Sequence, residues 1–81
     1  MIMGLTQDIF KDAPDWVVSA AVDEDGECYW YSVSEKLLKL GDGFWLYLQN
    51  NGASCEYLGD GFDAEDWQNS PIDRNKHENQ N

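Results

Sequence analysis

Cys28-Tyr29-Trp30-Tyr31 is the stretch on which the fold of this 81-residue chain depends. Three consecutive aromatic residues favour a β-strand, because their rings fit a pleated, half-buried surface. The stretch follows the acidic turn Asp23-Glu24-Asp25-Gly26, in which Gly26 is available for a positive φ. We therefore expect residues 27–32 to form a central strand that is entered through a hairpin turn.

The residues before this turn predict the partner strand of that hairpin. Residues 16–22 alternate between two faces, one with Trp16, Val18, Ala20 and Val22 and the other with Val17, Ser19 and Ala21. Because both faces are fairly apolar, we expect other parts of the chain to cover this strand on both sides.

A second hairpin is predicted downstream. Residues 44–48 read Phe-Trp-Leu-Tyr-Leu and are typical of a strand. Asn51-Gly52 follows and is the strongest hairpin signal in the chain, so we expect residues 53–58 to pair antiparallel with residues 44–48.

Short helical segments are expected at two places. Thr6 is placed to cap a helix that ends near Lys11 or Asp12, and Asp63 is placed to cap a turn anchored by Trp67. Residues 33–40 have two interpretations. We favour one or two helical turns capped by Ser34, and the alternative is a long loop with its leucines tucked beneath it.

The predicted fold class is α+β, a small three- to four-stranded antiparallel β-meander with one or two short helices. Its strands are expected near 16–22, 27–32, 44–48 and 53–58. Residues 1–72 would form a single compact domain, and residues 73–81 are polar and predicted to be a disordered tail.

The chain carries a net charge of −11, from 16 acidic and five basic residues. This charge disfavours direct contact with nucleic acid, whose phosphates are neutralised by Lys and Arg, and with anionic membranes. It would steer a basic protein partner toward the chain. The other interpretation is that acidity only maintains solubility.

Residue types that carry chemistry are sparse. The single histidine, His77, lies in the tail, so no nucleophile–histidine pair or histidine metal site is predicted. Asp23-x-Asp25-Gly26 resembles the start of a calcium loop, but Ala21 and Ser32 would occupy its first and twelfth positions. We expect no enzyme activity, no cofactor and no metal.

Cys28 and Cys55 are too few for a disulfide scaffold and lack the spacing of a zinc site. We expect two reduced, buried cysteines, which would lie close together only if their strands are neighbours. The N-terminus shows neither a signal peptide nor a membrane span, so the expected location is cytoplasmic.

Aromatic residues make up 14% of the chain, and two interpretations of them stay open. All the rings can belong to the core, or some can remain exposed among carboxylates and form a protein-binding surface, because Trp and Tyr dominate interface hot spots. The candidate binding residues are Trp30, Tyr31, Trp45, Tyr47, Asp60, Asp63, Glu65 and Asp66.

Three short motifs carry a family resemblance. Asp-Ala-Pro-x-Trp at residues 12–16, Gly-x-x-Tyr-Trp at 26–30 and Trp-x-x-Ser-x-Ile at 67–72 resemble small uncharacterised accessory proteins of tailed bacteriophages and prophages. The resemblance implies a protein that acts inside an infected bacterium, and it implies no enzyme activity or catalytic residue.

These observations favour a non-enzymatic phage or prophage accessory protein that binds a host or phage protein through an acidic, aromatic-bearing surface. The alternative is a DNA mimic that inhibits a host DNA-binding or restriction/defence protein, with carboxylates in rows roughly 6–7 Å apart in place of phosphates. A third hypothesis is a small metal-binding or hydrolytic domain. Homodimerisation through an exposed sheet edge or aromatic face is compatible with all three.

Overall fold

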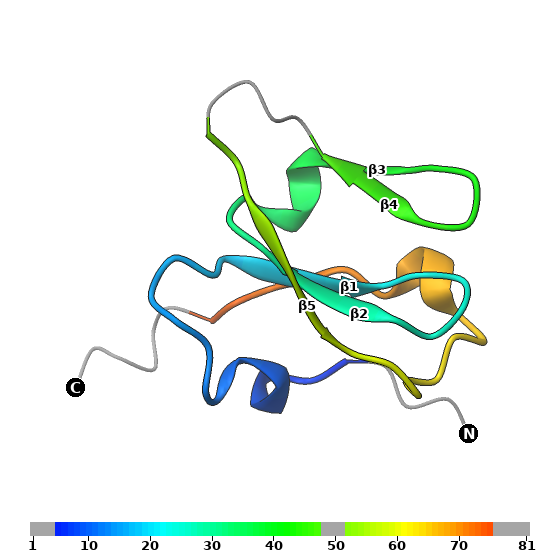
Figure 1. Ribbon diagram of the computed structural model, residues 1–81, viewed down its shortest axis with the longest axis horizontal. Helices are drawn as coiled ribbons and strands as arrows, with labels where there is room; N and C mark the ends of the chain where they lie inside the picture. Colours follow the sequence, from blue (N-terminus) through cyan, green and yellow to red (C-terminus); the bar gives the residue numbers. More distant parts are fainter. Residues whose placement is uncertain (1–4, 48–51, 76–81) are drawn as a thin grey trace.

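The computed structural model of the protein describes residues 5–47 and 52–75. Its main sheet has four antiparallel strands in the order β5-β2-β1-β6 (Figure 1). The strands are β1 (Ser19–Val22), β2 (Cys28–Tyr31), β5 (Cys55–Gly59) and β6 (Ile72–Asp73). The predicted β1–β2 hairpin and the interior position of β2 are confirmed, and Gly26 has the positive φ of +89° that its turn requires.

A separate two-stranded sheet pairs β3 (Leu38–Leu40) with β4 (Trp45–Tyr47), and Figure 1 shows this hairpin above the main sheet. The predicted pairing of residues 44–48 with 53–58 is therefore wrong, because β4 pairs with β3 and β5 pairs with β2. The Gly41 N–H donates to the Phe44 carbonyl at 2.8 Å and closes a short turn between β3 and β4. This short connection favours pairing of β4 with β3 over the predicted pairing of β4 with β5, which a longer connection would have joined. Leu48 and Asn51 lie outside the described residues.

The helical segments are single 3-10 turns, namely η1 (Gln7–Phe10), η2 (Glu35–Leu37) and η3 (Trp67–Asn69). The described ranges contain no α-helix, so the fold is a small antiparallel β domain rather than α+β. The Ser34 hydroxyl caps η2 as predicted, whereas Thr6 makes no side-chain cap bond. Both interpretations of residues 33–40 missed β3. Within the described residues, no helix is long and apolar enough to cross a membrane.

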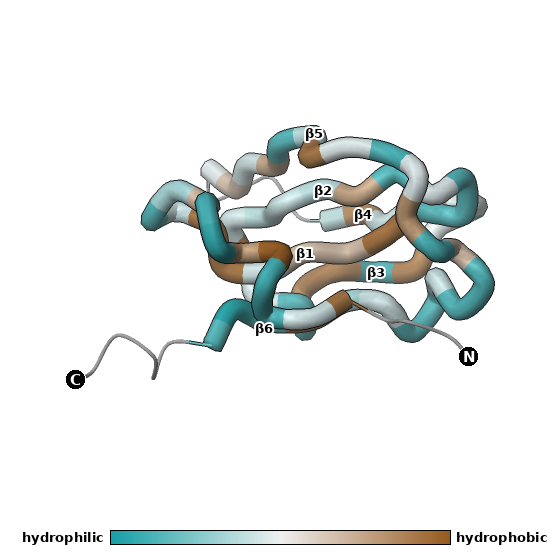
Figure 2. Tube along the Cα trace, turned by 90° about the horizontal axis from the view of Figure 1, so that it is seen from below, coloured by the Kyte–Doolittle hydropathy of each residue, from teal (hydrophilic) through white to brown (hydrophobic). Residues whose placement is uncertain are grey.

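Strand β1 is covered on both faces, as its sequence predicts. Ala20 and Val22 belong to one core cluster, and Ala21 belongs to a second cluster on the other side. Val17 packs with Ala20, against the predicted alternation, because the regular strand begins only at Ser19. The first cluster is Phe10, Val17, Ala20, Val22, Cys28 and Trp30, and the second is Ala21, Tyr31 and Leu38. Figure 2 shows the hydrophobic residues along β1, with hydrophilic residues in the connecting turns.

The ordered body extends past the boundary expected after residue 72. Asp73 lies in β6, and its carboxylate accepts hydrogen bonds from the Ser34 hydroxyl and the Glu35 N–H. The Arg74 guanidinium donates to three main-chain carbonyl oxygens in residues 13–17. The main-chain N–H of Arg74 donates to the Val18 carbonyl. These contacts tie the end of the described chain to the segment that leads into β1. The remainder of the predicted tail, residues 76–81, lies outside the described residues.

Replacement of Arg74 tests this tie. We expect Arg74→Met to lower the free energy of unfolding by about 1–3 kcal/mol, because carbonyls bound to a charged donor lose their partner. Arg74→Lys should recover part of the loss, since one ammonium group cannot span three carbonyls. Urea denaturation measures both, and the exposed Lys36→Met is the control for loss of one positive charge. A loss equal to that of the control would contradict the structural role.

Candidate functional site

Three turns abut at one end of the molecule, on the right in Figure 1. They are the β1–β2 turn at 23–27, the β3–β4 turn at 41–44 and the loop after β5 at 59–62. The Glu24 N–H donates to the Gly43 carbonyl at 3.0 Å, and the Phe62 N–H donates to the Gly26 carbonyl at 3.1 Å. Main-chain hydrogen bonds therefore fix the turns against one another.

Glycine permits this close approach. A Cβ atom on Gly26 would lie 3.0 Å from the Phe62 carbonyl oxygen, and Gly43 has a φ of +92° that other residues rarely adopt. A side chain at either position would push neighbouring turns apart or strain the backbone. The glycines that mark the turns in the sequence also allow the turns to meet.

These turns carry only negative charge. Lys and Arg are absent from residues 12–35 and 40–73, and the described basic residues are Lys11, Lys36, Lys39 and Arg74. We call this surface the acidic end. Its carboxylates belong to Asp23, Glu24, Asp25, Glu27, Asp42 and Asp60.

Asp23 is the buried member of the acidic end. Its Oδ1 accepts a hydrogen bond from the Trp45 N–H at 3.1 Å, which joins the β3–β4 hairpin to the main sheet. Burial raises the pKa of the Asp23 carboxyl, the Trp45 N–H opposes this shift, and the charges of Asp25 and Glu27 add to it. The charged form of Asp23 is therefore less favourable than in water.

Carboxylate oxygens of Asp23, Asp25 and Glu27 lie within 4.8 Å of one another. A calcium ion takes about six to eight oxygen ligands in proteins, so these three side chains alone do not complete a calcium site.

The charges of the acidic end also act on the hydroxyl of Tyr57. Its pKa is raised first by desolvation and then by the charges of Asp60, Glu27 and Asp25. The acidic end thus has crowded carboxylates, and the three turns that form it contain no Lys or Arg.

Substitution of Asp23 separates its hydrogen bond from its charge. Asp23→Asn keeps an acceptor for the Trp45 N–H and removes repulsion, so we expect thermal stability at pH 7 at or above that of the unmodified protein. Asp23→Ala leaves the Trp45 N–H without this acceptor and should lose about 1–3 kcal/mol.

The pH dependence follows from the direction of the shift. Because the pKa of Asp23 is higher in the folded than in the unfolded protein, its contribution to stability is complete below the unfolded pKa and is lost as pH rises through the folded pKa. The advantage of Asp23→Asn should therefore shrink as the pH falls toward about 4. Melting curves across this range check it, and an advantage that grows on acidification would refute the assignment.

The predicted aromatic site residues divide between core and surface. Trp30 and Tyr31 are buried, and the Trp30 indole N–H donates to the Ile9 carbonyl at 3.1 Å. The core interpretation therefore holds for these two residues. Trp45 and Tyr47 are half-buried, and Trp45 packs edge-on against Trp67.

A shallow hollow of about 260 Å³ lies beside these half-buried rings. Its aromatic lining includes Phe44, and the Tyr47 hydroxyl lies 3.4 Å from the Cys55 Sγ at its edge. Phe44 is 46% exposed, and Tyr57 on β5 is 50% exposed. Sequence reasoning missed both as surface aromatics, although Phe44 directly follows the Gly41-Asp42-Gly43 turn.

Both cysteines are free, but only Cys28 is buried, so the prediction of burial is wrong for Cys55. Burial, followed by the charge of Asp23, raises the pKa of the Cys28 thiol to about 12. Their strands are neighbours, yet Cys28 pairs with Gly59 while Cys55 pairs with Tyr31. The two cysteines therefore sit at opposite ends of the β2–β5 pairing.

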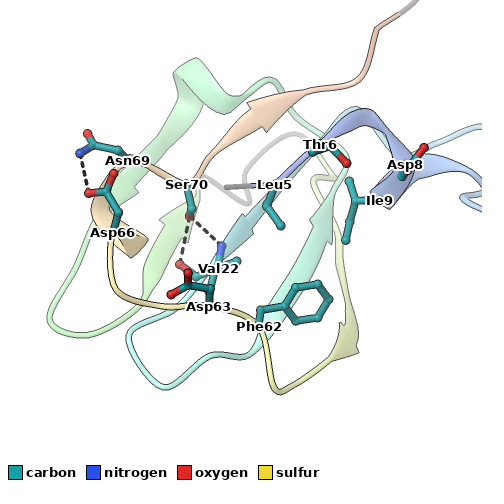
Figure 3. A pocket seen from close by; sticks show the side chains of 10 residues that line it. All are labelled: Leu5, Thr6, Asp8, Ile9, Val22, Phe62, Asp63, Asp66, Asn69 and Ser70. Atoms are coloured by element: carbon teal, nitrogen blue, oxygen red, sulfur yellow. Dashed lines mark hydrogen bonds between the residues drawn. The ribbon is translucent and has the colours of Figure 1, made fainter. Parts of the chain in front are cut away.

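The four predicted acidic site residues are all exposed, and Asp63 and Asp66 line a larger hollow of about 540 Å³ (Figure 3). Its apolar walls come from Leu5, Ile9, Val22 and Phe62. Asp60 and Glu65 are not among its lining residues, and Asp60 belongs to the acidic end.

The Ser70 hydroxyl lines this hollow and is a candidate nucleophile by residue type, but its hydrogen bonds go to the main chain. Its Oγ accepts from the Val22 N–H at 2.9 Å and donates to the Val22 carbonyl at 3.2 Å. The described residues contain no histidine that could activate it. The lining of this hollow combines apolar side chains with the carboxylates of Asp8, Asp63 and Asp66.

Comparisons of the chain with protein-family models, with curated proteins and with solved structures find no match.

Proposed function

We propose that this chain is a non-enzymatic phage or prophage accessory protein whose acidic end binds a basic surface of a host or phage protein in the bacterial cytoplasm. The observation that carries the proposal is the meeting of three turns that bring six carboxylates together without Lys or Arg.

Crowding of these carboxylates favours binding over solubility as their role. Solubility requires only a net charge, which evenly spread carboxylates would supply at less cost in repulsion. Here carboxylate oxygens of Asp23, Asp25 and Glu27 lie within 4.8 Å of one another. Burial is the main cause of the raised pKa of Asp23, and repulsion from the charges of Asp25 and Glu27 adds to it. A basic partner would relieve this repulsion, which favours complex formation.

The surface is also held ready for a partner. The turns are joined by main-chain hydrogen bonds, so little backbone freedom remains to be lost on binding. Tyr57 lies among the acidic residues, and Phe44 is exposed at the end of the β3–β4 turn. Exposed rings add apolar contact and can hold Lys or Arg through cation–π interactions.

DNA mimicry remains the second candidate, because a DNA-binding protein also presents a basic surface. The three carboxylates of Asp23, Asp25 and Glu27 form a cluster in which each offers an oxygen within 4.8 Å of the others, whereas mimicry calls for rows of carboxylates roughly 6–7 Å apart, so we prefer a general basic partner. Competition by double-stranded DNA for the captured partner would favour mimicry instead.

A pair of matched variants tests the proposed surface. Glu24→Gln/Asp42→Asn/Asp60→Asn neutralises one exposed carboxylate in each turn, and Asp12→Asn/Asp15→Asn/Glu65→Gln neutralises three exposed carboxylates elsewhere. We expect the first variant to retain about tenfold less of any partner captured from bacterial lysate by the unmodified protein, and the second to stay within about twofold. Quantitative mass spectrometry measures retention. Equal retention by both variants would contradict the proposed surface.

A further inference from the structure

The outer edge of β5 is the longest open strand edge of the main sheet in the described part of the chain. β5 pairs with β2 on one side only, and the opposite edge strand, β6, has two residues. Cys55, Glu56 and Tyr57 are all exposed. Because successive side chains point to opposite faces, three exposed residues in a row mean that neither face of β5 is covered there.

The hydrogen-bond pattern shows which main-chain groups point outward. Just before β5, the Ser54 carbonyl accepts from the Ser32 N–H at 3.0 Å, so Ser54 faces the β2 side. Residues of an antiparallel strand alternate in this respect, so Glu56 also faces β2. The N–H and C=O groups of Cys55 and Tyr57 therefore point away from the sheet and are open to another strand.

Charge selects the strand that can use this edge. Glu56 lies on β5, and Asp60 directly follows the strand. After desolvation, the charges of Asp60, Glu27 and Asp25 raise the pKa of the Tyr57 hydroxyl on the same strand. A second copy of this chain would bring two bodies of net charge −11 together and place acidic residues across the new pairing. An extended segment with Lys or Arg side chains would instead find complementary charges.

We propose that an extended, Lys- or Arg-bearing segment of the partner protein adds to β5 as a further strand. Its main chain bonds to the outward groups of Cys55 and Tyr57, and its basic side chains lie toward Glu56, Asp60 and Glu27. Strand addition draws affinity from main-chain hydrogen bonds and specificity from alternate side chains. This inference rests on the proposed function and adds the conformation of the partner and the strand that receives it.

A peptide pair tests strand addition directly. The probe is an acetylated, amidated heptapeptide of alternating Lys and Val, and its control carries N-methyl groups on two adjacent central residues, which block both edges at equal charge. Each peptide is titrated into the full chain at low salt, and NMR monitors the titration and gives the two affinities. We expect about tenfold weaker binding of the methylated peptide, and slower solvent exchange of the Cys55 and Tyr57 amides with the unmethylated one.

Charge variants of the chain supply the second arm. Glu56→Lys places a positive charge on the strand itself, whereas Asp12→Lys makes the same charge change at an exposed position elsewhere. We expect about tenfold weaker peptide binding for the first and less than about twofold for the second.

The outcomes separate this inference from the proposed function. Equal affinity for both peptides overturns strand addition but leaves an acidic binding surface in place. No binding of either peptide at low salt also overturns strand addition, and the pull-down with the three-turn variant then decides the proposed function by itself. Equal effects of Glu56→Lys and Asp12→Lys would likewise exclude β5 as the receiving strand.

Discussion

Burial of β1 and β2 on both faces is the constraint on which the rest of the structure depends. Ala20 and Val22 need one cover, and Ala21 and Tyr31 need another. The chain supplies both with short segments, since it forms no α-helix in its described ranges. Hydrogen bonds to the backbone help to hold these covers, such as those from the indole N–H groups of Trp30 to the Ile9 carbonyl and of Trp45 to the Val22 carbonyl.

The acidic end follows from this arrangement. The β3–β4 hairpin covers one face of the sheet through Leu38 and Trp45, and the Asp23 carboxylate and the Glu24 N–H anchor it at the β1–β2 turn. Anchoring there brings Asp42 against residues that are already acidic. Repulsion among these carboxylates costs stability, which the proposed basic partner would recover by neutralising them. Packing and the proposed binding thus use the same turns.

Local chemistry explains the successes and failures of sequence-based prediction. The β1–β2 hairpin was predictable because the Gly26 turn and two apolar strands are adjacent in sequence. The pairing of β5 was not, because Tyr57 pairs with Tyr29 across a long stretch of chain while β4 finds a closer partner in Leu38–Leu40. Trp30 and Tyr31 were wrong candidates for the binding site because they are buried. The sequence does not distinguish an aromatic ring that fills a core from one that binds a partner.

The sequence by itself determined the net charge of −11, which is a count of charged residues. It also determined the central position of Cys28–Tyr31 and the positive φ of Gly26, because a hairpin turn and its flanking strands are set by residues that are adjacent in the chain. Only the tertiary structure decided which carboxylates gather, which rings stay exposed and which strand edge is open. Those properties arise when segments distant in the chain compete to cover the same two faces, and that competition depends on packing in three dimensions rather than on local pattern.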